Sequence, residues 1–559
     1  MTWRLGFLAF FFASLCGALV FQLSGLQLNK GSVYVTEAQV RSRTANSSAR
    51  GIVYFTDKNG NDIPVALNKD YSVIYAVPKE IAENEKKSGL SAAAIAEMLA
   101  PIISVAPDDL RRRLSKKSDE YELLVPKVDG DLISRVSELG IKGIYIKKQP
   151  FRFYPFLSLG AHIVGFVSPP HENEETNSLF IGRYGMEQMA DEELRDIFAR
   201  RDTPRESGRD VRLTIDRTVQ AEGEELLSRI VRDYGATGGT FIVEEPKTGK
   251  ILGMGNIPTF DPNDFSESNV KNFLNPAVQA VYEPGSIFKV ITMAAGIDAG
   301  KITPETTYVD RGSLTLNGRT VSNWDLGQHG PYGRATMTNV IEHSINTGAI
   351  FAEQKTGHAI FTDYLKKFGF DEKTGIGLPG EVRGSLRNLT KGKEIDYATA
   401  SYGQGVSVTP LTLINAVSAI ANGGLLMKPL IRQDEEPRVI RRVIEEETAR
   451  QVTKMMASAV VANTVANLPN YTIAGKTGTA FIPDFGGRGY TDQVINTYIG
   501  FAPACADLTA EATCDPRFVV LIKLDRPEGA PLAGQTVVPI FREFTQFLLN
   551  YYKIAPDKS

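Results

Sequence analysis

Residues 282–292 read Tyr-Glu-Pro-Gly-Ser-Ile-Phe-Lys-Val-Ile-Thr, and this stretch decides how the rest of the chain is interpreted. Pro284 and Gly285 interrupt regular structure just before an apolar run that predicts a helix. Ser286 therefore falls in the first helical turn, and Lys289 lies three residues later on the same face, within contact range. A serine hydroxyl needs a nearby base to act as a nucleophile, and burial at the positive end of a helix dipole favours the neutral, basic form of a lysine. The pair is a candidate for nucleophilic catalysis.

The pattern Ser-x-x-Lys carries little weight by itself, because Ser268 and Lys271 repeat it. That copy has no Pro-Gly entry and lies among polar residues, so it is interpreted as a solvated loop. A second motif, Ser344-Ile345-Asn346, is the only Ser-x-Asn in the chain, and it separates a predicted helix at 338–343 from an apolar run at 347–352. A hydroxyl and an amide at such a helix break can relay a proton and hold a substrate amide. The alternative is a capping pair that joins two helices.

The third motif is Lys476-Thr477-Gly478-Thr479. Lys-Thr-Gly occurs four times, and the other copies are interpreted as a hairpin turn at 247–249, a helix end at 355–357 and a connection at 373–375. The copy at 476 alone continues a β pattern, and its glycines allow a ligand backbone to approach the strand closely. A cation, two hydroxyls and a strand edge together suit a peptide that ends in a carboxylate.

Ser-x-x-Lys, Ser-x-Asn and Lys-Thr-Gly in this order are the signature of penicillin-binding proteins and serine β-lactamases. The surrounding residues resemble class B penicillin-binding proteins, the monofunctional peptidoglycan D,D-transpeptidases, and look closest to the division-associated branch. The stretches that carry this resemblance are 275–277, 282–286, 364–370, 378–381, 402–405 and 409–411, with 50–54, 152–155, 162–167 and 185–187 upstream. Ile287 after the nucleophile and the segment 182–187 depart from the family pattern, and neither departure removes a chemical group from the site.

The resemblance implies a single N-terminal transmembrane helix, an α+β pedestal domain and an α/β serine transpeptidase domain. The last is of the penicillin-recognising, β-lactamase-like type, with an antiparallel sheet flanked by helices. The expected segments are a cytoplasmic stub and transmembrane anchor at 1–28, a non-catalytic pedestal of the dimerisation or partner-binding type at 29–210, the penicillin-binding transpeptidase domain at 211–552 and a polar tail at 553–559.

Local patterns supply the first secondary-structure expectations for these segments. Short strands are predicted at 52–55, 71–77, 121–125, 496–501 and 517–524, and helices at 92–99, 131–139, 219–234 and 539–552.

The first 28 residues predict a membrane anchor. Residues 5–21 are uncharged and mostly apolar, close to the roughly 20 residues that span a bilayer core. Trp3 and Arg4 precede the run, as an interfacial anchor and an inside charge do. A cleaved signal peptide is the alternative, although the run is long for one and no clear Ala-x-Ala site follows. We expect a single-pass protein of the cytoplasmic (inner) membrane with residues 30–559 outside the cytoplasm.

Composition and charge argue against a nucleic-acid-binding protein and against a metal site. The 559 residues are 42% hydrophobic and 23% charged, so the chain can bury sizeable cores, and a net charge of −3 offers no basic surface for nucleic acid. Five scattered histidines without a spaced ligand set argue against a metal site, and no cofactor is expected. Cys505 and Cys514 flank a short insertion between two predicted strands. The sequence leaves open whether they form a disulfide or are two free thiols.

The mechanism that the resemblance implies is acyl transfer from a peptidoglycan stem peptide. The nucleophile attacks the carbonyl between two terminal D-Ala residues, and an amine from a neighbouring stem then closes the crosslink. β-Lactams mimic D-Ala-D-Ala and are expected to remain on the same serine. The residues expected to form the site are Ser286, Lys289, Ser344, Asn346 and Lys476 for catalysis and Thr477, Gly478 and Thr479 for substrate binding.

The partners implied are stem peptides, β-lactam antibiotics, and a glycan polymerase of the SEDS family with other wall-synthesis proteins at the pedestal. Three alternatives to a septal transpeptidase stay open: a side-wall elongation transpeptidase, a β-lactamase or β-lactam sensor, and a catalytically silent scaffold of a wall-synthesis complex. The long upstream domain and the absence of a Glu-x-x-Leu-Asn string disfavour the β-lactamase. The intact side chains of all three motifs disfavour the scaffold.

Overall fold

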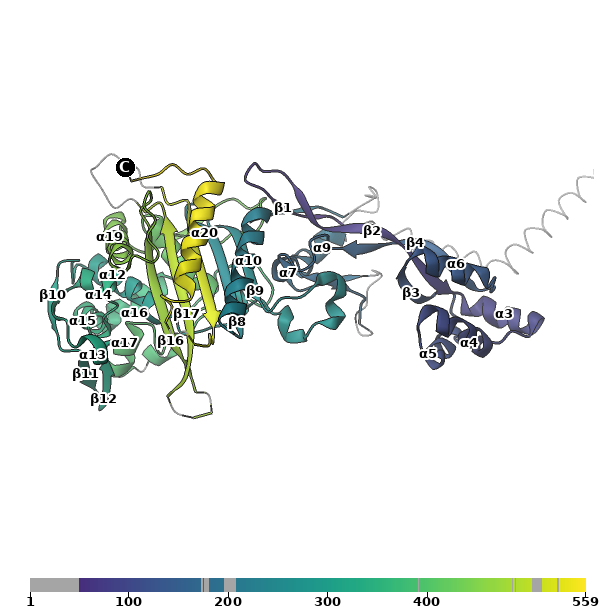
Figure 1. Cartoon of the computed structure of the whole chain (residues 1–559), viewed down its shortest axis with the longest axis horizontal. Helices are drawn as coiled ribbons and strands as arrows, with labels where there is room; N and C mark the ends of the chain where they lie inside the picture. The colour runs from purple at the N-terminus through teal and green to yellow at the C-terminus, as the bar shows by residue number, and fades with distance from the viewer. Residues whose placement is uncertain are drawn as a thin grey trace, which may run out of the picture.

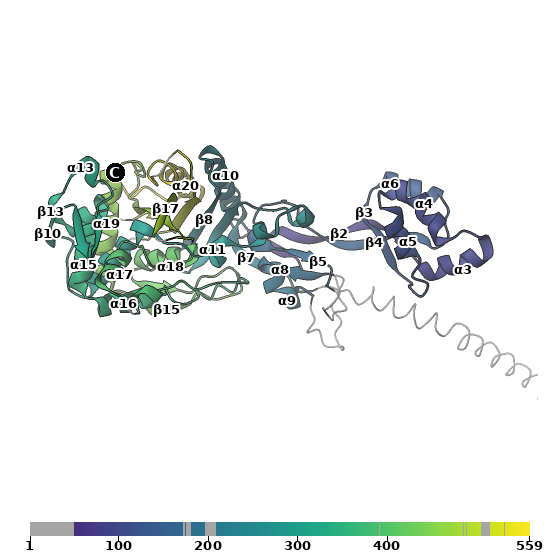
Figure 2. The same ribbon diagram turned by 90° about the horizontal axis from the view of Figure 1, so that it is seen from below.

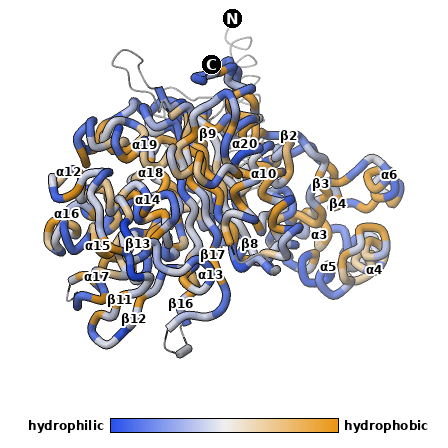
Figure 3. Tube along the Cα trace, turned by 60° about the vertical axis from the view of Figure 1, so that its left-hand side comes forward, coloured by the Kyte–Doolittle hydropathy of each residue, from blue (hydrophilic) through white to orange (hydrophobic). Residues whose placement is uncertain are grey.

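The computed structural model describes residues 50–171, 174, 180–195, 208–390, 392–484, 486–487, 489–504, 515–529 and 532–558. The molecule is elongated, with a slender N-terminal part that extends from a larger globular C-terminal part (Figure 1). Hydrophobic stretches run along the central strands and helices of both parts, and hydrophilic stretches lie mostly at the rim (Figure 3).

The C-terminal part is organised around a five-stranded sheet in which every neighbouring pair is antiparallel. Its order is β16-β17-β18-β8-β9, so β16 forms one edge. The strands are β8 (Gly238–Glu245), β9 (Lys250–Ile257), β16 (Ala474–Pro483), β17 (Tyr490–Ala502) and β18 (Phe518–Asp525). Alternate residues of each strand enter different cores, as the period of a strand requires. Because all four pairings between neighbouring strands are antiparallel, the prediction of an antiparallel sheet is confirmed.

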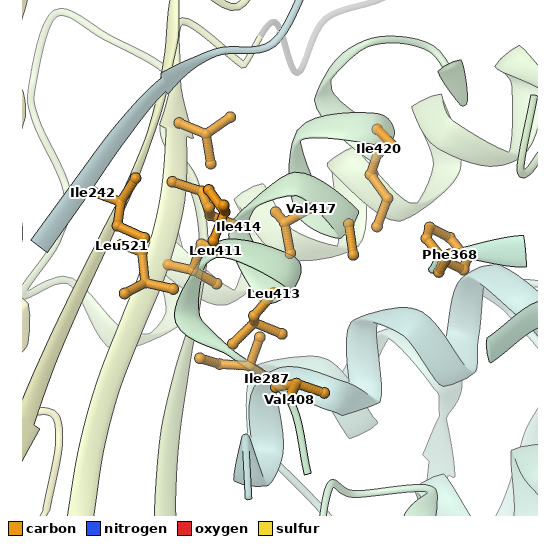
Figure 4. Packing of buried hydrophobic residues seen from close by; sticks show 14 of the residues in the cluster. Ile242, Ile287, Phe368, Val408, Leu411, Leu413, Ile414, Val417, Ile420 and Leu521 are labelled. Atoms are coloured by element: carbon orange, nitrogen blue, oxygen red, sulfur yellow. The ribbon is translucent and has the colours of Figure 1, made fainter. Parts of the chain in front are cut away.

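Helices cover both faces of this sheet. On one face, α10 (Arg217–Asp233) and α20 (Val537–Tyr551) pack with Phe241, Tyr498 and Val520 in one core cluster. On the other face lies α18 (Pro410–Ala421), which is buried at every position from Pro410 to Ile420. Such a helix belongs in the interior, although its buried positions include the polar side chains of Thr412, Asn415 and Ser418. Figure 4 shows Leu411 and Ile414 of this helix on the side of Ile242 and Leu521 of the sheet, whereas Ile420 lies on the side of Phe368.

The N-terminal part is built on a second sheet whose longest strand is β2. This strand pairs antiparallel with β1, β3 and β4, and β1 pairs parallel with β7. The strands are β1 (Val53–Thr56), β2 (Ile63–Ala76), β3 (Glu122–Val128), β4 (Ile144–Phe153) and β7 (Val211–Asp216). Because β7 pairs with β1, the residues that we expected to open the transpeptidase domain belong to the pedestal sheet, and the 210/211 boundary stays a prediction.

Four helices form a head at the far end of β2, away from the C-terminal part (Figure 2). They are α3 (Pro78–Ser88), α4 (Ala92–Ile103), α5 (Pro107–Leu114) and α6 (Gly130–Glu138). Their apolar residues share one core with Ile74 and Leu124 of the strands. As predicted, Ser91 caps α4, because its Oγ accepts a hydrogen bond from the Ala94 N–H at 3.2 Å.

The remaining helices and strands complete the two parts. They are α7 (Ala161–Val164), β5 (Phe166–Ser168), β6 (Ile181–Arg183), α8 (Gly185–Met189), α9 (Asp191–Arg195), η2 (Pro262–Glu267), η3 (Val270–Phe273), α11 (Pro276–Gln279), η4 (Gly285–Ile287), α12 (Phe288–Asp298), β10 (Thr307–Asp310), β11 (Ser313–Leu316), β12 (Arg319–Ser322), α13 (Leu326–His329), β13 (Gly333–Thr336), α14 (Met337–Glu342), α15 (Asn346–Thr356), α16 (His358–Lys367), η5 (Arg387–Leu389), α17 (Glu394–Ala400), β14 (Leu425–Met427), β15 (Val439–Arg442) and α19 (Glu446–Asn463).

Two expectations fall outside the described residues. The predicted anchor at 1–28 lies there, as do Cys505 and Cys514 with their disulfide question. Across the part of the chain that the structure does describe, no helix combines the length and apolarity needed to cross a membrane. The single-pass anchor and the disulfide therefore stay predictions.

A buried ion-pair network joins three of the stretches that carried the family resemblance. Glu187 on α8 is fully buried and contacts Arg50 Nε through Oε2 and Arg152 Nε through Oε1, each at 2.6 Å. Arg50 also contacts Asp191 at 2.7 Å. Burial alone raises the pKa of Glu187, but Arg152 and Arg50 outweigh it and hold that pKa below its ordinary value. The network fastens the start of the described chain to β4 and α8.

We expect Glu187→Ala to destabilise the protein strongly, because it removes the buried carboxylate that the Arg50 and Arg152 guanidinium groups share, while Arg50 keeps its pair with Asp191. Breaking a buried pair costs about 3–5 kcal/mol. Calorimetric unfolding of the full chain checks this. The control is Asp108→Ala, which removes an exposed pair with Arg111 and changes stability by less than about 0.5 kcal/mol. Since the pKa of Glu187 is lowered, its contribution is present near neutral pH and is lost as the pH falls. Equal effects of the two substitutions contradict the prediction.

Candidate active site

The three sequence motifs meet beside the edge strand of the large sheet. Ser286 lies in the 3-10 turn η4, which leads directly into α12. Ser344 occupies the break between α14 and α15, where its backbone adopts a left-handed conformation with φ of 58°. Lys476 is the third residue of β16. The fold therefore gathers side chains from a turn, a helix break and a strand edge.

Lys289 is the centre of this cluster. Its Nζ lies 3.0 Å from Ser286 Oγ, 3.0 Å from Ser344 Oγ and 2.6 Å from the Ser344 carbonyl oxygen. The side chain is completely buried. Burial, and then the nearby charge of Lys476, lower the pKa of Lys289 well below its ordinary value. A neutral amine has two hydrogens and one lone pair, so it can donate to both Ser344 oxygens and still accept the proton of the Ser286 hydroxyl.

Ser344 connects the two lysines. Its Oγ also accepts a hydrogen bond from Lys476 Nζ at 3.1 Å. With both acceptor positions of the hydroxyl occupied by amines, the hydroxyl hydrogen is left to donate elsewhere. Burial lowers the pKa of Lys476 to about 7. The arrangement keeps two amines and two hydroxyls in one chain of proton-sharing contacts.

The remaining predicted residues surround this chain of contacts. Asn346 donates through Nδ2 to the Ser322 carbonyl at 2.9 Å. Thr477 Oγ1 accepts from Lys476 Nζ at 3.2 Å. A Cβ atom on Gly478 would lie 2.7 Å from the Pro284 carbonyl, so a glycine lets β16 lie directly against the turn that carries the nucleophile.

The Thr479 hydroxyl has two hydrogen-bonding partners within the protein. It donates to Asn496 Oδ1 and accepts from the Ala533 N–H, both at 3.2 Å. These contacts fix the side chain toward β17 and the segment before α20. Thr479 still borders the cleft, so its part in holding a carboxylate stays a prediction.

Six of the predicted residues line a cleft of about 970 Å³, namely Ser286, Ser344, Asn346, Lys476, Thr477 and Thr479. Its walls add aromatic residues that sequence reasoning missed, namely Trp324, Tyr332, Tyr402, Phe481 and Tyr490. Tyr402 belongs to the stretch 402–405 that carried the family resemblance, where it was given no role in the site, and the other four lie outside the stretches that carried it. A cleft with apolar walls and a few convergent polar groups is typical of a substrate site.

A buried carboxylate near the lysine was also missed by sequence reasoning. Asp325 accepts a hydrogen bond from the Tyr332 hydroxyl at 2.5 Å and is 7% exposed. Its negative charge raises the pKa of Lys289, which opposes the larger effect of burial. Tyr332 in turn stacks between the rings of His329 and His343, with centroids 4.1 and 5.0 Å away.

The duplicate motifs lie elsewhere, as the sequence predicted. The copy at 247–249 forms the turn between β8 and β9, and the copy at 355–357 ends α15 with Gly357 at its C-terminus. Lys271 of the second Ser-x-x-Lys is exposed in η3, a short 3-10 helix where we expected a loop. Within the described ranges, no group of three or more histidine, cysteine, aspartate or glutamate side chains is placed to hold a metal ion.

Two family models match the chain. The model for the penicillin binding protein transpeptidase domain matches residues 239–546. The model for the penicillin-binding protein dimerisation domain matches residues 45–227. Together they cover most of the chain, in the order that the sequence predicted.

Similar proteins agree with these models. Stage V sporulation protein D of Bacillus subtilis is 30% identical over 98% of this chain and 86% of its own length. Peptidoglycan D,D-transpeptidase FtsI of Escherichia coli is 26% identical over 99% of this chain and 93% of its own. Among solved structures, penicillin binding protein 3 of Mycobacterium tuberculosis in complex with aztreonam has a TM-score of 0.67 and 26% identity, and the match covers 91% of this chain and 97% of the other.

Proposed function

We propose that this chain, which belongs to the class B penicillin-binding proteins, crosslinks peptidoglycan stem peptides through an acyl-enzyme at Ser286 during septal wall synthesis. Membership of that family makes it a serine-type acyl-transfer enzyme, a peptidoglycan D,D-transpeptidase. One observation supports the assignment of roles most strongly. Lys289 Nζ lies 3.0 Å from the hydroxyl oxygens of both Ser286 and Ser344, in a buried site that favours its neutral form.

The first half-reaction is acylation. Ser286 Oγ bonds to the carbonyl carbon between the two terminal D-Ala residues while Lys289 takes the hydroxyl proton. The amide C–N bond then breaks, and the proton passes through the Ser344 hydroxyl to the departing D-Ala amine. General base and acid steps of this kind contribute typically about 10²–10⁴-fold each.

Substrate recognition falls to the strand edge and the helix break. Asn346 holds the amide of the stem peptide, and Lys476 with Thr477 and Thr479 binds its terminal carboxylate, while Gly478 gives the strand room. The backbone N–H groups of Ser286 and Thr479 form the oxyanion hole, as in the family that the chain belongs to. Losing one such donor costs typically about 10²–10³ in rate.

The second half-reaction transfers the acyl group to an amine of a neighbouring stem peptide, which forms the new amide bond and frees Ser286. A β-lactam carries its own strained amide, so the same attack on it yields an acyl-enzyme from which no leaving group departs. β-Lactams are therefore ligands and covalent inhibitors of this site.

The setting of the reaction is the outer side of the cytoplasmic membrane, where stem peptides are. The anchor at 1–28 holds the protein there, and the pedestal at 29–210 binds a SEDS-family glycan polymerase and other wall-synthesis proteins. The transpeptidase domain at 211–552 then acts on the strands that the polymerase supplies. Accumulation of a fluorescent fusion at the septum rather than the side wall distinguishes the division role from elongation.

Labelled penicillin is expected to acylate Ser286, because only this Ser-x-x-Lys serine has its lysine buried beside it. Mass spectrometry of the labelled peptide locates the adduct. Ser286→Ala removes labelling, whereas the matched control Ser268→Ala leaves it unchanged. An adduct on Ser268, or retained labelling of Ser286→Ala, contradicts the assignment.

Lys289→Arg is expected to lower the acylation rate by several orders of magnitude, because arginine keeps the positive charge and does not release its proton near neutral pH. Stopped-flow acylation measures the effect, and Lys271→Arg in the second motif copy serves as control. Since the pKa of Lys289 is lowered, wild-type acylation is present near neutral pH and falls as acid protonates the amine. Near wild-type acylation by Lys289→Arg would mean that another group is the base.

Removal of residues 1–28 is expected to give a soluble protein that still binds penicillin and fails to support growth, because the catalytic motifs all follow the anchor. External protease on spheroplasts should degrade the full-length protein to little more than that anchor. If the catalytic domain resists protease until the cells are opened, along with a cytosolic control, the topology is wrong.

A further inference from the structure

The segment just before the nucleophile is fastened along its length to a second segment. We call residues 282–285 the nucleophile strap. Tyr282 and Val408 exchange two backbone hydrogen bonds, at 3.0 and 2.9 Å, and the Gly285 N–H donates to the Gly403 carbonyl at 3.2 Å. The strap thus runs antiparallel to residues 403–408. Figure 4 shows Ile287, two residues beyond the strap, beside Val408, which lies two residues before the start of α18.

Backbone contacts also hold the end of the strap from both sides. A Cβ atom on Gly403 would lie 2.2 Å from the Gly285 carbonyl oxygen. On the opposite side, a Cβ atom on Gly285 would lie 2.9 Å from the Thr479 carbonyl oxygen of β16. Two glycines therefore let three backbones stack in direct contact, with the nucleophile turn in the middle.

Glu283 supplies a side-chain contact at the centre of the strap. Its Oε1 accepts the Gly405 N–H at 3.0 Å, and its Oε2 accepts the Tyr490 hydroxyl at 3.0 Å. Tyr490 is the first residue of β17 and borders the cleft. Burial raises the pKa of Glu283, and the two hydrogen bonds from Gly405 and Tyr490 oppose that rise. One carboxylate therefore connects the nucleophile segment, the segment 403–408 and the hairpin of β16 and β17.

We propose that Glu283 is a positioning residue for Ser286, which it holds in register with the cleft wall that Tyr490 forms. The proposal rests on the assignment of Ser286 as the nucleophile. Glu283 lies three residues before Ser286, so a shift of its carboxylate tilts the turn that aims Oγ at Lys289 and at the substrate carbonyl. A displacement of about 1 Å in such a site costs on the order of 10²-fold in rate.

Substitutions of Glu283 and Tyr490 remove different numbers of these hydrogen bonds. In Glu283→Gln the amide oxygen still accepts from the Gly405 N–H, and the amide NH2 donates to the Tyr490 hydroxyl, which can turn to accept. Glu283→Ala loses both contacts. Tyr490→Phe loses one contact, and Tyr490 is 43% exposed, so the loss is smaller.

The test measures acylation of the full-length protein by a fluorescent penicillin in stopped flow, which separates the acylation rate constant from the dissociation constant of the initial complex. We expect Glu283→Ala to lower the rate constant by about 10²-fold, with the dissociation constant within about threefold of wild type. Tyr490→Phe should lower the rate constant by about 3–10-fold, and Glu283→Gln should keep it within about threefold. Adding Tyr490→Phe to Glu283→Ala should cause no further loss, because the contact is already gone.

A matched control is available in the pedestal. There Tyr145 donates through its hydroxyl to Glu80 Oε2 at 2.5 Å, so Tyr145→Phe removes the same kind of pair far from the cleft and should leave acylation unchanged. The proposal is overturned if Glu283→Ala acylates within threefold of wild type, if its loss appears in the dissociation constant, or if the two substitutions act additively. If Glu283→Ala does not fold, Tyr490→Phe decides, and an unchanged rate constant at an unchanged melting temperature overturns the proposal. Retained labelling of Ser286→Ala is a separate outcome that rejects the nucleophile itself.

Discussion

A buried lysine nitrogen that contacts hydroxyls from two distant segments is the constraint on which the site depends. Burial lowers the pKa of Lys289 well below its ordinary value, and the buried amine is tolerated because Ser286 and Ser344 give it hydrogen-bonding partners. The amine and the two hydroxyls must be brought together, and this requirement explains why a turn, a helix break and a strand edge converge at one place.

The large sheet and α18, the helix packed against it, form a rigid support that brings the amine and the two hydroxyls together. α18 is buried along its whole length between the sheet and the surrounding helices, so the segment that precedes it has little freedom to move. The same segment holds the nucleophile strap by backbone hydrogen bonds at Tyr282 and Gly285. Gly478 then allows β16 to lie against the turn. The packing of the core therefore helps to fix the position of the Ser286 hydroxyl oxygen.

Electrostatics act in opposite ways in the two parts of the molecule. In the pedestal, Glu187 is charged because two arginines surround it, and the ion pairs connect segments that are far apart in the sequence. In the cleft, burial and the charge of Lys476 lower the pKa of Lys289 well below its ordinary value. The first arrangement stabilises a structure, whereas the second favours the neutral, basic form of a reactive group. Both follow from what surrounds a buried ionisable side chain.

The sequence alone determined the order of the three motifs and local features such as the Ser91 cap and the β8–β9 turn, because these depend on residues close together in the chain. The antiparallel sheet was expected only through the family resemblance, because it pairs β18 with β8 from the other end of the domain. The tertiary structure alone decided that β7 pairs with β1 in the pedestal sheet and that β2 extends to 14 residues. It also decided that the hydroxyl of Thr479 is held by Asn496 and Ala533, and that Asp325, Glu283 and Tyr490 lie around the nucleophile. Strand pairing and side-chain proximity across 17 to 207 residues are set by how layers pack, and no local pattern of propensity or hydrophobicity records that.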